Sequence, residues 1–202
     1  MPTVPAAEKG TPPVLATQPE HAQHVFDMLT LAFAADPANR WMYPSPQQYL
    51  RYFPAFARAL GGAAFERRTA FVCQDYSGAA LWLPPDAGPD GQALAALAEE
   101  SVEPQKKADL FAVFEEMGRR HPAEPHWYLP LIGVDPMRQG QGLGAALLQP
   151  VLEQCDAARL PAYLESTNPR NRPLYERHGF EATGEIRIGT CPPIVPMLRK
   201  PA

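Results

Sequence analysis

Between residues 14 and 121, apolar side chains recur mostly at intervals of three and four, the spacing of amphipathic helices. In chain order, this part of the sequence predicts a strand at 14–17, a helix that starts at 22 and ends near Asp36, a helix at 47–60 that stops at Gly61, a hairpin with arms at 69–74 and 79–83, and helices at 93–100 and 106–120. The aromatic-rich segment 40–44, between the first two helices, is predicted to be a loop.

The last third of the chain has a different pattern. A strand at 127–134, an amphipathic helix at 142–158 and a short apolar strand at 162–165 together predict one βαβ unit with parallel strands. A second helix at 171–178 is followed by strands near 180–188 and 194–199. The fold class is therefore mixed α/β, with a central twisted mixed sheet flanked by helices.

Length and composition narrow the possible organisation. The 202 residues suit one core, so we expect a flexible tail at 1–12 and a single domain at 13–202. No apolar run approaches the roughly 20 residues that span a bilayer, so no membrane association is expected and the predicted location is cytoplasmic.

Charge and metal-ligand residues exclude two further classes. The 18 basic and 22 acidic residues give a net charge of −4, and the basic ones form no stripe, which argues against a nucleic-acid partner. The three cysteines and five histidines have no metal-ligand spacing, so no metal is expected.

The chemistry-bearing segment is 132–144, which runs from a strand into a helix and has glycines at 140, 142 and 144. Without Cβ atoms, these glycines allow a tight turn whose backbone N–H groups converge on one point. The N-terminus of the following helix adds positive partial charge. The segment therefore predicts a phosphate or pyrophosphate site.

Three interpretations of this turn remain open from the residues alone. The spacing Gly140-x-Gly142-x-x-Ala145 also matches the dinucleotide fingerprint, and Glu165 follows 20 residues after Ala145. Against that interpretation, the 58 residues after Gly144 turn into strands without crossover helices. The glycines can also simply end a loop.

Two motifs in order make this chain resemble the GNAT family of acyl-CoA N-acyltransferases. Gln139-x-x-Gly142-x-Gly144 resembles the family's pyrophosphate-binding signature, and the segment from Asn168 to Phe180 resembles its second element, with Asn171 where alanine is common. The resemblance implies acetyl-CoA as co-substrate. The cofactor-binding residues it implies are Ile132, Gly133, Val134, Gln139, Gly140, Gln141, Gly142, Leu143, Gly144, Ala145, Asn168 and Asn171.

The resemblance also implies catalytic roles. Tyr175 stands at the family's catalytic tyrosine and is the candidate general acid for the departing thiol. Glu165, at the carboxyl end of a parallel strand, is a candidate base or amine anchor. The strands that end at Val134 and Glu165 are expected to diverge around the pantetheine arm, and Asn168 and Asn171 are expected to contact that arm or to cap the helix.

Within the family, residues 126–200 look most like the branch that acetylates aminonucleosides. The expected reaction is acetyl transfer to a primary amine of a small molecule, either aminonucleoside- or antibiotic-like or a polyamine, by direct attack in a ternary complex. The alternatives are a non-catalytic CoA-binding regulatory module and acetylation of a protein amine. A homodimer is possible through exposed strand edges. The aromatic residues considered for the acceptor site or the core are Trp41, Tyr43, Phe111 and Phe114.

Overall fold

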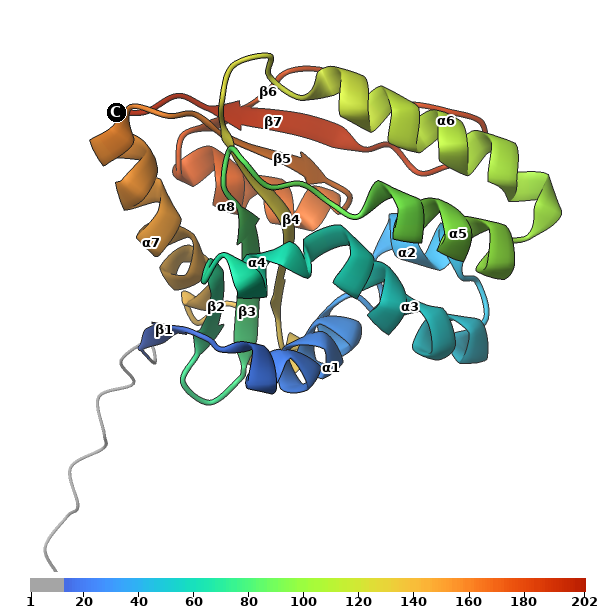
Figure 1. Cartoon of the computed structure of the whole chain (residues 1–202), viewed down its shortest axis with the longest axis horizontal. Helices are drawn as coiled ribbons and strands as arrows, with labels where there is room; N and C mark the ends of the chain where they lie inside the picture. Colours follow the sequence, from blue (N-terminus) through green and yellow to red (C-terminus); the bar gives the residue numbers. More distant parts are fainter. Residues whose placement is uncertain (1–12) are drawn as a thin grey trace, which may run out of the picture.

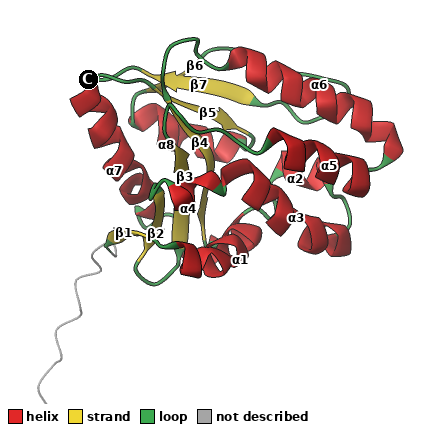
Figure 2. Cartoon of the chain, in the orientation of Figure 1, coloured by secondary structure: helices red, strands yellow, loops and turns green. Residues whose placement is uncertain are grey.

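The computed structural model describes residues 13–202, so the tail expected at 1–12 lies outside the described residues. Its sheet has seven strands in the order β1-β2-β3-β4-β5-β7-β6, with helices around it (Figure 2). The strands are β1 (Val14–Ala16), β2 (Ala70–Cys73), β3 (Gly78–Leu83), β4 (Trp127–Val134), β5 (Ala162–Ser166), β6 (Phe180–Ala182) and β7 (Val195–Arg199). The α-helices are α1 (Ala22–Ala32), α2 (Pro37–Met42), α3 (Pro46–Gly61), α4 (Ala63–Glu66), α5 (Gly91–Ser101), α6 (Pro104–Arg120), α7 (Leu143–Ala158) and α8 (Arg172–Arg177).

The sheet is covered on both faces. Alternate residues of β3 pack in opposite directions: Leu81 joins a core with α1 and α3, whereas Trp82 joins a second core with α7. All six residues of β3 are buried as a result. Figure 1 shows α7 on one side of the sheet, and α1 and α3 on the other. This arrangement matches the mixed α/β class expected from the sequence.

Capping residues set the start of several helices. Ser45 accepts the backbone N–H of Gln48 at the start of α3, and Asp90 accepts that of Ala93 at the start of α5. Proline follows the cap directly in α3, where its missing N–H costs no helical hydrogen bond.

Strands β4 and β5 are parallel but pair only at their beginnings. Trp127 is opposite Ala162 and Tyr128 is opposite Tyr163, and the strands then diverge. On its other side, β4 has an irregular register with β3: between the pairs Leu81–Leu131 and Leu83–Tyr128, two residues of β4 oppose one of β3. Pro130 lies in this bulge, where its missing N–H is tolerated.

The order of strands excludes the dinucleotide-binding interpretation. After β5, the chain forms β7 antiparallel to β5 and β6 antiparallel to β7, so in the described part of the chain β4 and β5 are the one parallel pair. A doubly wound dinucleotide fold continues with further parallel strands and crossover helices.

Two predictions of local structure are wrong. The segment 40–44, expected to be a loop, lies largely in α2, because Asp36 caps that helix and Pro37 is its first residue. The strand expected at 180–188 ends at Ala182, and Ile186 then forms an isolated bridge with Ile194. The helix expected to stop at Gly61 does end there, and the short helix α4 follows after Gly62.

Across residues 13–202, none of the helices combines the length and the apolar character that crossing a bilayer requires.

Candidate functional site

Two cavities meet where β4 and β5 diverge. The first, the apolar cavity, has a volume of about 480 Å³ and lies between α3, α5, α6 and the diverging strands. The second, the glycine-turn cavity, has a volume of about 380 Å³ and is bounded by the turn before α7 and by α8. Residues that line both cavities are Phe33, Ile132, Asn171 and Tyr175. A molecule in one cavity can therefore contact a molecule in the other at this junction.

The sequence-predicted binding residues surround the glycine-turn cavity. All of them line it except Gln141, whose side chain accepts a hydrogen bond from Arg138 Nε at 3.1 Å. Three arginines, Arg138, Arg170 and Arg177, line the same cavity against one carboxylate, Asp36. The charge of the lining therefore suits a phosphorylated ligand.

The turn has the backbone conformation that its glycines predict. Gly140 and Gly142 have φ angles of 75° and 82°, in the left-handed region where a Cβ is strained. Gly142 is the N-cap of α7 and has no side chain to bind the first N–H groups of that helix. These N–H groups, at the positive end of the helix, fit a pyrophosphate.

The divergence of the strands exposes backbone donors on β4. The N–H of Asp135 donates to Ser77 O beside β3, so by strand alternation the N–H groups of Ile132 and Val134 point to the opposite edge, toward β5. Gly133, between them, is required by packing, since a Cβ there would lie 2.7 Å from the Cβ of Ala32 in α1.

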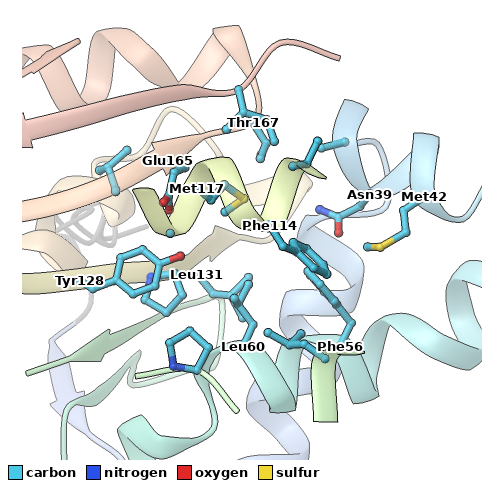
Figure 3. Close-up of a pocket in the computed structure, with 18 of the residues that line it drawn as sticks. Asn39, Met42, Phe56, Leu60, Phe114, Met117, Tyr128, Leu131, Glu165 and Thr167 are labelled. Carbon is cyan, nitrogen blue, oxygen red and sulfur yellow. The ribbon is translucent and has the colours of Figure 1, made fainter. Parts of the chain in front are cut away.

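The apolar cavity is walled mainly by aromatic and aliphatic side chains. Of the candidate aromatic residues, Trp41, Phe111 and Phe114 line it, whereas Tyr43 is buried in the core and hydrogen-bonded to Ser101. Glu165 is the one carboxylate among the lining residues, and no lysine or arginine is among them. Figure 3 shows Glu165 entering the cavity from β5, near Met117 of α6 and opposite Tyr128 of β4.

Glu165 is a buried carboxylate beside a histidine. Its side chain is 3% exposed, and its Oε1 lies 3.3 Å from His121 Nε2. The neighbouring phenols of Tyr128 and Tyr163 have pKa values raised by burial and further by the charge of Glu165, so both remain protonated.

Tyr175 lies at the junction of the two cavities and is buried. Burial raises the pKa of its phenol well above the ordinary value, and the charge of Asp36 adds to this, while a hydrogen bond with Asn171 opposes it. A protonated phenol is thus held between the cavities. Asn168 has a different role: its side chain accepts the N–H of Arg170 and caps the short 3-10 turn Pro169–Asn171.

Sequence reasoning missed Asp36 and His121, as it did Arg170 and Arg177. Asp36 Oδ2 accepts the Thr167 hydroxyl at 2.6 Å, and Oδ1 accepts the backbone and side-chain N–H groups of Asn39. Its Asp-Pro pattern before a helix is a capping signal that indicates structure but not proximity to Tyr175. His121 follows α6 directly and had no local signal at all.

Comparisons with known proteins agree with this geometry. The family model described as the acetyltransferase (GNAT) family matches residues 71–180, which include β2, the glycine turn, α7, β5 and α8. An uncharacterized N-acetyltransferase of Schizosaccharomyces pombe is 40% identical over 78 residues, which are 37% of this chain and 32% of that protein. The match thus spans about a third of that relative's length.

Solved structures resemble nearly the whole chain. A protein described as histone acetyltransferase HPA2 and related acetyltransferase, from Corynebacterium glutamicum, has a TM-score of 0.68 and 27% identity, with 96% of this chain and 98% of that chain covered. Arylalkylamine N-acetyltransferase 2 from Aedes aegypti has a TM-score of 0.63 at 13% identity, with 93% and 97% covered, which shows a shared fold alone.

Proposed function

The chain belongs to the acetyltransferase (GNAT) family, and on this premise we propose that it is an N-acetyltransferase that moves an acetyl group from acetyl-CoA to a primary amine of a small molecule, by direct attack in a ternary complex. The observation that carries the proposal is the junction of the two cavities. A phosphate-complementary cavity and an apolar cavity meet at Tyr175 and Ile132, so two different ligands can react there.

The glycine-turn cavity is the proposed site of acetyl-CoA. The N–H groups from Gly140 to Ala145 would hold the pyrophosphate, and Arg138, Arg170 and Arg177 would neutralise the phosphates. When bound, acetyl-CoA supplies the acetyl group as a thioester. The N–H groups of Ile132 and Val134, on the free edge of β4, are the proposed donors to its carbonyl, a role that typically contributes about 3–4 kcal/mol to transition-state stabilisation.

Tyr175 is the proposed general acid. Its buried phenol keeps its proton at neutral pH, which is the state required to protonate a departing thiolate. Asn171, at the start of α8, lines the same junction, and its interaction with the phenol partly opposes the rise of the phenol's pKa. Asn171 therefore supports catalysis in this proposal in addition to lining the cofactor cavity.

Glu165 is the proposed anchor and base for the amine. A protonated amine that enters the apolar cavity meets one buried carboxylate, and that carboxylate can accept the proton which the amine must lose before it attacks. Placing the amine at Glu165 also directs the rest of the acceptor toward Trp41, Phe111 and Phe114.

The lining of the apolar cavity favours an acceptor with one amine on an aromatic or apolar body. A polyamine or an aminoglycoside has several cationic centres, which need several carboxylates, and the described lining supplies one. Aromatic walls suit a nucleobase or aryl ring. The resemblance of residues 126–200 to puromycin N-acetyltransferase supports an aminonucleoside among the acceptors.

The test is release of free thiol from acetyl-CoA with a panel that contains an aminonucleoside, an arylalkylamine, a polyamine, an aminoglycoside and a lysine peptide. We expect release with the first two. Release with the peptide alone would instead identify a protein acetyltransferase. Binding of CoA by calorimetry without release in any arm would identify a non-catalytic CoA-binding module.

A further inference from the structure

Two histidines connect Glu165 to the surface of the molecule through short polar contacts. His121 Nε2 lies 3.3 Å from Glu165 Oε1, and His121 Nδ1 lies 3.0 Å from His126 Nε2. His126 Nδ1 in turn lies 2.8 Å from the backbone carbonyl oxygen of Glu124. Both histidines come from the segment that joins α6 to β4, whereas Glu165 lies on β5. The contacts therefore connect that segment to β5.

The carbonyl at the outer end fixes the positions of the protons. A carbonyl oxygen can only accept, so His126 Nδ1 must donate to Glu124 O, and the Nε2 of neutral His126 must accept. His121 Nδ1 is then the donor to His126, which leaves Nε2 of neutral His121 without a proton. That bare nitrogen faces Oε1 of Glu165.

The ring of His121 is surrounded mainly by other rings. Its ring packs against the phenols of Tyr128 on β4 and Tyr163 on β5, with centroids 4.6 and 4.5 Å away. On α6, the helix that ends next to His121, Arg120 and Glu116 form an ion pair with each other at 2.7 Å. Glu165 Oε1 is buried and has no well-aligned hydrogen bond among the described residues.

We propose that His121 is the group that removes the amine's proton from Glu165 and releases it to solvent, and that His126 is a positioning residue which fixes the tautomer required for this step. The proposal rests on the function proposed above. The amine N–H bond breaks as the Glu165 O–H bond forms, and that O–H bond then breaks as the His121 Nε2–H bond forms. The imidazolium keeps its Nδ1–H bond to His126 and gives the Nε2 proton to water, which its side chain, 26% exposed, can reach.

This sequence of transfers restores the starting state without a ring flip. The proton enters and leaves His121 at the same nitrogen, so the hydrogen bonds to His126 and Glu124 stay in place throughout. Without such an exit, the proton would remain on Glu165, because the phenols beside it are protonated and cannot accept it.

The first test measures acetylation of an aromatic amine by His121→Ala, with His24→Gln in the exposed face of α1 as the control. Loss of a general base typically costs 10²- to 10⁴-fold, and we expect kcat to fall by about 100-fold with CoA affinity unchanged. Added imidazole should restore at least part of the lost rate in His121→Ala and leave the control unaffected. A rate deficit that imidazole does not alter would overturn the role of His121, since it would reflect packing.

The second test does not depend on activity and so separates this inference from the proposed function. ¹⁵N NMR of the wild-type chain above neutral pH should show His121 protonated at Nδ1. In His126→Phe, which removes the acceptor and retains an aromatic ring, the protonated nitrogen should change to a mixture or to Nε2. A wild-type His121 protonated at Nε2, or an unchanged tautomer in His126→Phe, would refute the arrangement even if the chain acetylates no amine tested.

Discussion

Asp36 Oδ2 accepts a hydrogen bond from Thr167 Oγ1 at 2.6 Å, which joins residues 131 positions apart. Asp36 caps the start of α2, and Thr167 directly follows β5. The same carboxylate raises the pKa of the Tyr175 phenol. The bond therefore connects two elements of the site, and the charge of its carboxylate favours the protonated form of Tyr175.

The Asp36–Thr167 bond should be measurable as a coupling energy. Asp36→Ala removes both a helix cap and a buried acceptor, and we expect unfolding free energy to fall by about 2–4 kcal/mol. In a double-mutant cycle with Thr167→Val, followed by chemical denaturation, the coupling should be about 1 kcal/mol. Strict additivity of the two substitutions would show that the bond contributes nothing to stability.

Tyr175→Phe tests the general acid with minimal change in packing. Removal of a catalytic acid should lower kcat by at least about tenfold, while calorimetry should find CoA affinity within about twofold of wild type. Tyr76→Phe, in the hairpin between β2 and β3, is the control and should retain full turnover. Equal rates for wild type and Tyr175→Phe would rule out proton donation by this phenol.

Gly142→Ala tests the left-handed turn. A Cβ at a φ of 82° is strained by about 1 kcal/mol or more, and relief of that strain would redirect the N–H groups that face the cavity. We expect CoA affinity to fall by about tenfold or more. The control is Gly88→Ala, where a Cβ meets nothing within 4 Å. If Gly142→Ala bound CoA with wild-type affinity, the turn would not be the part of the chain that binds the cofactor.

Phe114→Ala tests the aromatic wall of the acceptor cavity. Loss of an aromatic contact costs about 1 kcal/mol, so KM for an aromatic amine should rise by about fivefold while KM for acetyl-CoA is unchanged. Steady-state kinetics with both substrates measures this. A parallel rise in both KM values would indicate general disruption in place of a specific acceptor contact.

The Asp156–Arg199 pair should make stability depend on acid pH. Arg199 donates two hydrogen bonds to Asp156, which lowers the pKa of that carboxyl to about 2. A depressed pKa stabilises the fold above the ordinary value near 3.8, and the contribution is lost as pH falls toward 2. Because the carboxylate is partly exposed, we expect Asp156→Asn to cost about 1 kcal/mol at neutral pH.

Thermal unfolding of Asp156→Asn and wild type at several pH values checks this. The difference in Tm between them should be constant above about pH 5 and shrink below it. The exposed Glu181→Gln is the control, for which no such trend is expected. A Tm difference independent of pH would contradict the linkage.

The parts of the site that could be predicted are those whose backbone conformation is set by residues close together in the sequence. The glycine turn could be recognised because left-handed φ angles leave a glycine signature within a few positions. The same holds for the helix with Tyr175, which is preceded by an asparagine cap and followed by Gly179. The predicted boundaries were wrong where the role of a capping residue was not recognised. Asp36 caps α2, so the residues that follow it form a helix in place of the expected loop.

Contacts between residues far apart in the sequence left no comparable pattern in it. His121 lies beside Glu165 because α6 packs across the end of β5. Neither the helical periodicity of the sequence nor the spacing between these two residues indicates that contact. The same is true of Asp36 and Thr167. A single sequence shows which residue types are present in each element, whereas the packing of helices on the sheet decides which of them meet.

The two-residue pairing of β4 with β5 divides the sheet into two half-sheets, β1-β2-β3-β4 and β5-β7-β6, joined by little main-chain bonding. In the function proposed above, acetyl-CoA would lie along this seam, and its own amide groups would bond to the facing strand edges in place of a missing strand. Bound there, it would connect the two half-sheets more firmly than the two paired residues do alone. Amide hydrogen exchange along the facing edges of β4 and β5 should therefore slow when acetyl-CoA is added, before any acceptor is present.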